Sequence, residues 1–430
     1  MSGNRVVQGS IAIRWWPIVL CALSVLMDGY DAQMLAMAIP LMAKEFGVAP
    51  TAFAPAASAS LAGMAIGALF LSPLADRFGR RPLLIVSLLL FGAPTLLAMS
   101  SSGPFEMMLW RLLAGCGLGA TVPVTIGISA EFAPAGRRVS IATIAASGFA
   151  IGASSAGLIT PLLAAHWGWR GMFAYGGIVP LVIAALVVRG VPDSRPASAA
   201  AVRVRARTPA GAPRLGLIFA AGTWRRTVLL WLLNALNLFA NYGVASWLPT
   251  LLVQNGWSLP DASRVMAVLS IGAVTGSIYV SRCVDRGRIV LGFGGAYLVA
   301  TLALALCATN PGEFWVWAGL LVMYGFGAIG TSLTHAPLAT ILYDEEARST
   351  GVGWANGFGR AGSLFGPLGL AWLMNQQLPP TQVLAVLIVP MLACAACVLL
   401  LVLVLRAENS AAAPARALGA ATAPEVESAR

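Results

Sequence analysis

Charged residues are scarce in this chain. They make up 10% of its 430 residues, whereas a soluble domain carries about 25%. The sequence has 16 acidic residues and 2 histidines, and it contains no phosphate-binding loop, metal-spaced His/Cys cluster or nucleophile elbow. These shortages count against an enzyme, an ATP-driven pump and a bound metal or cofactor, so we expect none of them.

The chain is also poor in cysteine, with six residues that indicate no disulfide framework. Nearly all of them lie in apolar runs. Cys394 and Cys397 form a C-x-x-C pair, but it falls in a predicted spanning helix, where packing is favoured over redox or metal chemistry.

Apolar sequence is abundant instead, at 58% of the chain, and 46 glycines suit close helix contacts in lipid. The apolar sequence divides into twelve stretches that can each cross a bilayer as a helix. We therefore predict an all-α membrane protein with twelve transmembrane helices. The predicted spans are 15–43, 52–75, 82–102, 105–130, 140–165, 170–189, 227–253, 261–282, 289–309, 314–342, 349–375 and 381–405.

The basic residues lie mostly on one side of these spans. Of the 27 Lys and Arg, Lys44, Arg170 and Arg264 fall on the far side, and Arg111 and Arg360 fall inside spans. Cytoplasmic loops of membrane proteins carry such an excess of basic residues. The pattern predicts a multi-pass protein with both termini in the cytoplasm, and it accounts for the net charge of +11 without nucleic-acid binding.

Two landmarks recur at an offset of 209 residues, which indicates an internal repeat. Asp76-Arg77-Phe78-Gly79-Arg80 follows the second span and Asp285-Arg286-Gly287-Arg288 the eighth; Gly148-Phe149 and Gly357-Phe358 lie within the fifth and eleventh. A same-direction repeat of six spans implies two pseudo-symmetric six-helix bundles with a midplane site between them. The predicted domains are an N-terminal bundle (1–190), a cytoplasmic linker (191–226), a C-terminal bundle (227–406) and a disordered tail (407–430).

Asp28 and Asp31 are the acids that lie well inside a predicted span. Three residues apart on a helix, they share one face, and ionisable groups at such depth mark ion or substrate pathways. Arg111 enters from the other side to a depth of ~9 Å and is nearly level with them. A nearby guanidinium lowers the pKa of a carboxyl group, whereas burial raises it. An acid balanced between these two effects can take up a proton from outside and release it inside. The alternative is a permanent Asp31–Arg111 ion pair that leaves Asp28 alone to titrate.

A polar stripe runs along the seventh span, because Asn234, Asn237 and Asn241 are spaced for one helix face. Three amides in lipid need partners, which either a substrate cavity or a neighbouring helix can supply. Asn356 and Arg360 form a similar stripe on the eleventh span, where no acid of the second half lies at the same depth. Arg360 is therefore a candidate carboxylate ligand; alternatively, helix-end carbonyls satisfy it.

A histidine and five aromatic residues are further candidates. His335, in the tenth span, is either a proton relay or a hydrogen-bonded structural residue. Tyr30 and Tyr242 can stack on a substrate ring, as can Trp247, Tyr324 and Trp354, although such aromatic residues also serve packing.

The loop after the second span resembles a known signature. Ala75-Asp76-Arg77-Phe78-Gly79-Arg80-Arg81-Pro82 is similar to the signature loop of the major facilitator superfamily, with a degraded second copy at Asp285–Arg288. The resemblance implies the MFS fold and a cytoplasmic gate. Asp76 would meet the start of the eleventh span, and Arg77, Arg80 and Arg81 would bridge to acids such as Glu131, unless they only set the orientation.

A narrower resemblance is to the aromatic acid:proton symporters, which transport benzoate-type acids. Asp28-Gly29-Tyr30-Asp31 matches their first-span motif, and the eleventh span matches well. Tyr343-Asp344-Glu345-Glu346 departs from the pattern, which puts the gate contacts in question. The other matching segments are Ala130–Pro134 with Arg137 and Arg138, Gly168-Trp169-Arg170 with Phe173, Trp247–Thr250, Arg348, Thr350–Gly353, Gly357–Gly362 and Gly366-Pro367.

Together these features predict a proton-coupled secondary transporter. It imports a small aromatic carboxylate across a bacterial inner membrane by alternating access, and its partners are that substrate, protons and the lipid bilayer; we expect a monomer. The alternatives are a drug or metabolite efflux antiporter and a non-transporting receptor. The predicted sites are proton-coupling Asp28, Asp31, Arg111 and His335; substrate-binding Tyr30, Arg111, Asn234, Asn237, Asn241, Tyr242, Asn356 and Arg360; and gating Asp76, Arg77, Gly79, Arg80, Arg81, Glu131 and Arg137.

Overall fold

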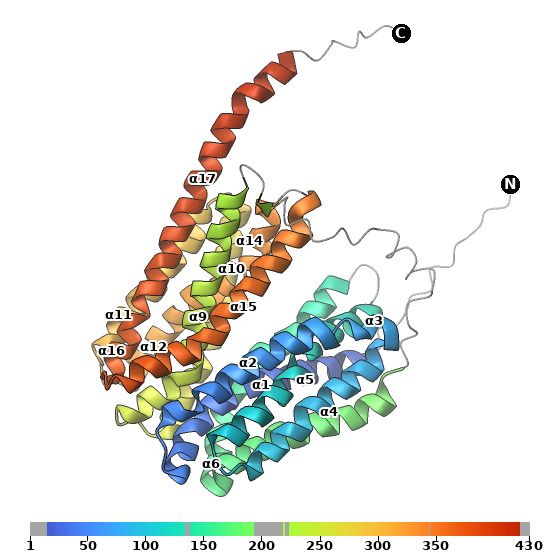
Figure 1. The fold of residues 1–430 in the computed structure, drawn as a ribbon, viewed down its shortest axis with the longest axis vertical. Helices are drawn as coiled ribbons and strands as arrows, with labels where there is room; N and C mark the ends of the chain where they lie inside the picture. The colour runs from blue at the N-terminus through green and yellow to red at the C-terminus, as the bar shows by residue number, and fades with distance from the viewer. Residues whose placement is uncertain (1–14, 134–137, 193–217, 220–222, 344, 422–430) are drawn as a thin grey trace, which may run out of the picture. The chain divides into compact units, whose positions relative to one another are not determined.

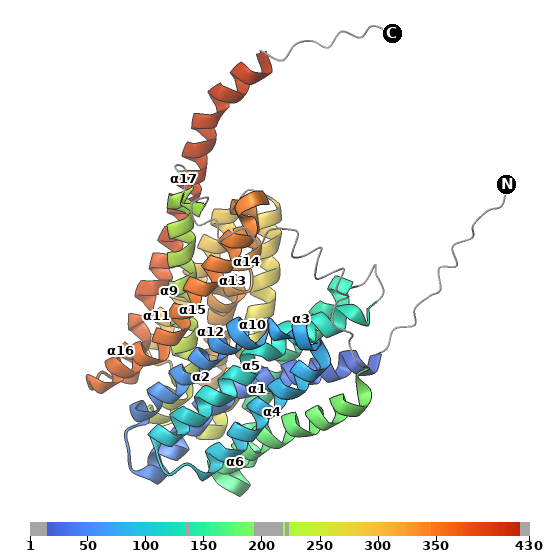
Figure 2. The same ribbon diagram turned by 45° about the vertical axis from the view of Figure 1, so that its right-hand side comes forward.

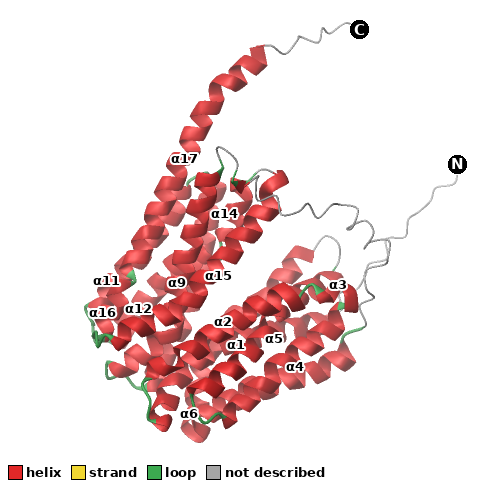
Figure 3. Cartoon of the chain, in the orientation of Figure 1, coloured by secondary structure: helices red, strands yellow, loops and turns green. Residues whose placement is uncertain are grey.

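The computed structural model describes residues 15–133, 138–192, 218–219, 223–343 and 345–421. All regular structure within these ranges is helical, as predicted (Figure 3). The long helices of the first half are α1 (Trp15–Phe46), α2 (Ala54–Ile66), α4 (Arg80–Leu97), α5 (Pro104–Glu131) and α6 (Arg138–Gly190); those of the second are α9 (Trp224–Gln254), α10 (Leu259–Asp285), α11 (Gly295–Ala308), α12 (Phe314–Tyr324), α15 (Glu345–Asn375) and α17 (Ile388–Ala421).

Shorter helices complete the path of the chain. Three of them, η2, η5 and η6, are π-helical segments of five residues each. The short helices are η1 (Pro50–Phe53), η2 (Gly67–Leu71), α3 (Leu74–Phe78), η3 (Ala98–Ser100), η5 (Val290–Gly294), η6 (Gly325–Ile329), α13 (Gly330–Ser332), α14 (His335–Leu342) and α16 (Pro380–Val386).

The helices account for the twelve predicted spans. Ten segments of the described chain are long and apolar enough to cross a membrane. One of them, Gly148–Gly190, holds two spans, because α6 leaves helical geometry at Gly168 with a φ of 60°. The twelfth is α15, which is 31 residues long but carries charged residues, Arg360 among them.

The chain divides into two compact units (Figure 1). The first comprises Met1–Pro209, Tyr242–Ser270 and Leu364–Pro380, and the second Ala210–Asn241, Ile271–Ser363 and Thr381–Arg430. Helices α9, α10 and α15 therefore contribute to both. The predicted boundaries at 190, 226 and 406 stay predictions.

Glycines set the helix packing of the first unit. A Cβ added to Gly29 of α1 would lie 2.0 Å from the Phe149 carbonyl oxygen of α6, and one added to Gly63 of α2 would lie 2.2 Å from the Leu112 oxygen of α5. At these positions only glycine lets the backbones approach, which is how helices gain packing energy in lipid. Helix α1 consequently lies against α6, and α2 against α5.

The second unit repeats this packing. Gly272 and Gly276 of α10 lie 209 residues after Gly63 of α2 and Gly67 of η2. A Cβ added to Gly272 would lie 2.0 Å from the carbonyl oxygen of Val322 in α12, and one added to Gly276 would lie 2.1 Å from that of Phe326 in η6. The two glycines thus recur at the offset of 209 residues that the sequence motifs indicate. Their contact partners recur at 210 residues, from Leu112 and Cys116 to Val322 and Phe326.

Helix α17 extends beyond the predicted last span. It continues to Ala421, past the ends of α9 and α14 of the same unit (Figures 1 and 2). Residues 407–421, which the sequence analysis expected to be a disordered tail, are helical, and seven alanines from Ala411 to Ala421 favour a helix. Residues 422–430 lie outside the described ranges.

Candidate functional site

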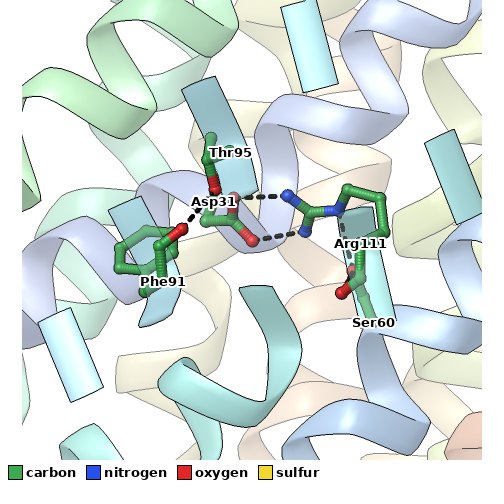
Figure 4. A network of polar contacts seen from close by, with 5 residues as sticks. All are labelled: Asp31, Ser60, Phe91, Thr95 and Arg111. Atoms are coloured by element: carbon green, nitrogen blue, oxygen red, sulfur yellow. Dashed lines mark hydrogen bonds and ion pairs between the residues drawn. The ribbon is translucent and has the colours of Figure 1, made fainter. Parts of the chain in front are cut away.

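A buried ion pair joins α1 to α5 in the first unit. Arg111 Nη1 donates to Asp31 Oδ1 at 2.7 Å and Nη2 to Oδ2 at 2.5 Å (Figure 4). Both side chains are 2% exposed, and so is Asp28, one turn earlier on α1. The structure thus contains an Asp31–Arg111 ion pair, and the proton-coupling role of both acids stays a prediction.

The third donor of the guanidinium binds a serine that the sequence analysis did not single out. Arg111 Nε donates to Ser60 Oγ on α2 at 2.8 Å. Because a carboxylate and a hydroxyl occupy three of its five N–H donors, this arginine is well satisfied at depth. Ser60 and Gly63 of α2 and Gly67 of η2 have a helical spacing and share the face that packs on α5. The sequence shows this spacing but not the helix that the face meets.

Tyr30 faces α6. It is fully buried, and its hydroxyl donates to the Met172 carbonyl oxygen at 3.1 Å. Its ring packs edge-on against Tyr175, with the centroids 4.9 Å apart. In this structure α6 therefore contacts both the ring and the hydroxyl of Tyr30, and the predicted stacking of Tyr30 on a substrate ring stays a prediction.

In the second unit, His335 of α14 connects α9 to α11. Its Nδ1 lies 3.0 Å from Asn234 Oδ1, and its Nε2 lies 2.8 Å from the Tyr297 hydroxyl. Asn234 in turn donates from Nδ2 to the Ala355 carbonyl oxygen of α15 at 2.9 Å. The side chain of His335 is 3% exposed. This hydrogen-bonded arrangement corresponds to the structural alternative for His335.

The other two amides of the stripe bind a π-helical segment. Asn237 and Asn241 both donate to the carbonyl oxygen of Ala328 in η6, at 3.0 and 3.1 Å. A π-helical turn leaves backbone groups without their usual helical partners, which side chains can satisfy. Asn241 also donates to Asn237 Oδ1 and accepts from the Tyr324 hydroxyl. Neighbouring helices thus provide the partners of these amides, although their predicted substrate role is not tested.

Arg360 differs from Arg111. Its side chain is exposed on α15 and makes no hydrogen bond or ion pair with the residues that the structure describes. Asn356, one turn earlier, is exposed as well, and Ser363 Oγ donates to the Arg360 backbone oxygen at 2.7 Å. An arginine without a protein partner is available to an anion. Tyr242 is half-buried and belongs to the other unit.

The signature loop contains an ion pair that the sequence analysis expected. Arg80 Nη1 lies 2.8 Å from Glu131 Oε1 and 2.7 Å from the Gly127 carbonyl oxygen. Gly79, between α3 and α4, has a φ of 94°, where glycine is strongly favoured. Burial raises the pKa of Glu131 above its ordinary value, and the charge of Arg80 opposes that shift.

The other gating residues are only partly described. Arg81 donates to the Val188 carbonyl oxygen, and the guanidinium carbon of Arg77 lies 5.2 Å from the Phe78 ring centroid. The side chain of Asp76 and all of Arg137 lie outside the described residues, so the predicted contact of Asp76 with the start of α15 stays a prediction.

A sequence profile of the Major Facilitator Superfamily matches residues 21–367. The chain belongs to this superfamily. It is a multi-pass membrane transporter and not an enzyme. The fold agrees, because a crystal structure of a bacterial homologue of the human lysosomal transporter Spinster superposes with a TM-score of 0.73 at 16% identity, covering 93% of this chain and 99% of that one.

Individual relatives are more specific than the match to the superfamily. The 4-hydroxybenzoate transporter PcaK of Acinetobacter baylyi is 31% identical over 414 residues, which are 89% of this chain and 90% of the relative. The 3-(3-hydroxy-phenyl)propionate transporter of Escherichia coli is 34% identical over 355 residues, which are 82% and 85% of the two chains. Both are bacterial transporters named for aromatic acids, as the resemblance in the first-span motif implies.

Proposed function

We propose that this transporter imports a small aromatic carboxylate together with protons across the bacterial inner membrane, with both termini in the cytoplasm. The observation that carries the coupling is the ion pair of Asp31 and Arg111, buried inside a spanning segment with Asp28 one turn away. Acids at such depth are costly and are kept for ion pathways. The names of the relatives support the substrate class.

The coupling has a physical motive. Moving one negative charge inward against a potential of 100 mV costs about 2.3 kcal/mol, and one proton that accompanies the carboxylate cancels this cost. Asp28 and Asp31 are the proposed proton sites. His335 was a third candidate, but both of its ring nitrogens already have partners.

Arg360 is the proposed ligand of the substrate carboxylate. A guanidinium matches a carboxylate with two parallel hydrogen bonds. Arg360 is exposed and has no partner in the described part of the chain, whereas Asp31 already occupies Arg111. Asn356, exposed on the same helix, is proposed to contact the rest of the substrate. Arg111 remains the alternative carboxylate ligand.

Alternating access requires a gate at each end of the transport path. At one end we propose the Arg80–Glu131 ion pair together with the other residues of the signature loop. At the other, contacts within the first unit support a gate of small residues. Ser58 Oγ donates to the Leu364 carbonyl oxygen at 2.8 Å, and Ser154 Oγ to that of Ala267 at 3.3 Å. Neutral hydrogen bonds of this kind separate at modest cost.

The test is uptake by the purified protein in proteoliposomes. Labelled 4-hydroxybenzoate should accumulate when the outside is acidic, and the accumulation should collapse when a protonophore removes the gradient. 4-Hydroxybenzyl alcohol, which lacks the carboxylate, should not compete. Equal uptake with and without the gradient would overturn the coupling, and absence of uptake for benzoate-type acids would overturn the substrate class.

A further inference from the structure

The guanidinium of Arg111 is held at two separate edges. Its Nη edge meets both oxygens of Asp31, whereas its Nε meets the hydroxyl of Ser60 on a third helix (Figure 4). Asp31 is a charged partner that can be neutralised by a proton. Ser60 is a neutral partner that does not change with pH.

The two contacts respond differently when Asp31 takes up a proton. The carboxyl group loses its charge, so the charge-assisted hydrogen bonds from both Nη atoms weaken. The Nε–H of Arg111 still donates to Ser60 Oγ, which is 2.8 Å away and on a residue that is 7% exposed. A long arginine side chain gains rotamer entropy on release, and the retained contact with Ser60 opposes that release.

We propose that Ser60 is a positioning residue that keeps Arg111 in place while Asp31 is protonated, so that the ion pair re-forms when Asp31 releases its proton. The inference rests on the proposed proton coupling at Asp31. It does not depend on which arginine binds the substrate carboxylate.

Helix packing fixes the position of Ser60. A Cβ added to Gly115 of α5 would lie 2.3 Å from the Ser60 carbonyl oxygen, and one added to Gly63 would lie 2.2 Å from the Leu112 oxygen. The backbones of α2 and α5 therefore touch at Ser60 itself and again at Gly63, beside Leu112, the residue that follows Arg111. Because this contact is rigid, Ser60 can serve as a fixed point for the guanidinium.

The test compares Ser60→Thr with Ser60→Val. The two replacements have nearly the same shape and differ in the hydroxyl, so an effect of packing changes both alike. Each variant is reconstituted and assayed for uptake of 4-hydroxybenzoate driven by a pH gradient. It is also assayed for counterflow, the exchange of labelled for unlabelled acid without a gradient.

We expect Ser60→Val to lower gradient-driven accumulation about ten-fold, the scale of one lost hydrogen bond to a charged group, while counterflow stays within about two-fold of wild type. Ser60→Thr should accumulate substrate nearly as the wild type does. The pH dependence of uptake should flatten in the valine variant alone. As a control, Ser87→Val alters a buried serine whose Oγ has no partner among the described residues, and it should leave coupling unchanged.

Equal accumulation by the threonine and valine variants would overturn the role of Ser60. Parallel loss of accumulation and counterflow in the valine variant would also overturn it, because the serine would then support the fold or the substrate site. If the wild type exchanges the acid but does not accumulate it, the proposed coupling fails instead. These results are distinguishable in one set of assays.

Discussion

His335 Nδ1 lies 3.0 Å from Oδ1 of Asn234, and this contact determines which ring nitrogen carries the proton. Asn234 Nδ2 already donates to the Ala355 carbonyl oxygen, so Oδ1 must accept and Nδ1 must donate. Nε2 is then the acceptor for the Tyr297 hydroxyl. A neutral imidazole satisfies both contacts, whereas a second proton on the ring would require Tyr297 to find another acceptor.

We therefore predict that His335→Ala affects stability more than coupling. The substitution leaves Asn234 Oδ1 and the Tyr297 hydroxyl without their partner, at about 1–3 kcal/mol for each buried group. The melting temperature in detergent should fall, while the pH profile of uptake, normalised to folded protein, should match that of the wild type. A displaced pH profile would return His335 to the proton pathway.

A second prediction concerns the glycine inside the first-span motif. Gly29→Ala should place a Cβ 2.0 Å from the Phe149 carbonyl oxygen, and since that atom is backbone, α1 and α6 must separate. We expect the free energy of unfolding to fall by about 3 kcal/mol or more, so that little folded protein is recovered. Gly319→Ala in α12 is the matched control, because nothing lies within 4 Å of its added Cβ. Similar yields of the two variants on size-exclusion chromatography would contradict the proposed packing.

Part of the fold and of the candidate site could be predicted from the sequence, and part could not. Hydropathy predicts the number of spans, motif spacing predicts the repeat, and helical rise predicts that Asp31 and Arg111 lie at the same depth. Each of these depends only on the order of residues along the chain. Ser60 and Tyr297 could not be found in this way, because their roles depend on which helix face meets which neighbour. The partners of Asn237 and Asn241 arise from a π-helical turn that periodicity does not predict.

The third prediction concerns the Arg80–Glu131 pair. Both side chains are partly exposed, so the pair contributes about 0.2–1 kcal/mol, enough to shift a balanced conformational equilibrium. If the pair latches the outward-facing state, its loss in Glu131→Gln should increase the inward-facing population. Labelling of introduced periplasmic cysteines measures this population. Arg80→Gln combined with Glu131→Gln should be no worse than either single variant if the two residues act as a pair.

Acid should reproduce the loss of this pair. Because burial raises the pKa of Glu131, its carboxylate becomes neutral at a higher pH than an ordinary glutamate, and the ion pair is lost as pH falls through that value. The wild type should therefore shift toward inward-facing states on acidification more than Glu131→Gln, which has no carboxylate to protonate. Identical shifts would show that other groups cause the change.

The fourth prediction concerns the acids of α1. Asp28→Asn and Asp31→Asn should each abolish accumulation driven by a pH gradient. Asp31→Asn should also destabilise the protein by about 3–5 kcal/mol, because it leaves Arg111 as a buried cation without a charged partner. Asp31→Asn with Arg111→Gln should recover much of that stability but not the coupling. Wild-type accumulation by both single variants would place the proton site elsewhere.

The last prediction concerns Arg360 as the ligand of the carboxylate. Lysine keeps the charge but not the planar fork, so Arg360→Lys should remain folded and weaken binding of an aromatic acid by about 1–3 kcal/mol. Arg360→Ala should weaken the acid much more than the matching amide, because only the acid carries the charge that the guanidinium pairs. Calorimetry with 4-hydroxybenzoate and 4-hydroxybenzamide in detergent compares the two ligands for each variant. If Arg360→Ala weakens acid and amide equally, the residue is structural, and Arg111 becomes the better candidate for the counter-ion of the substrate.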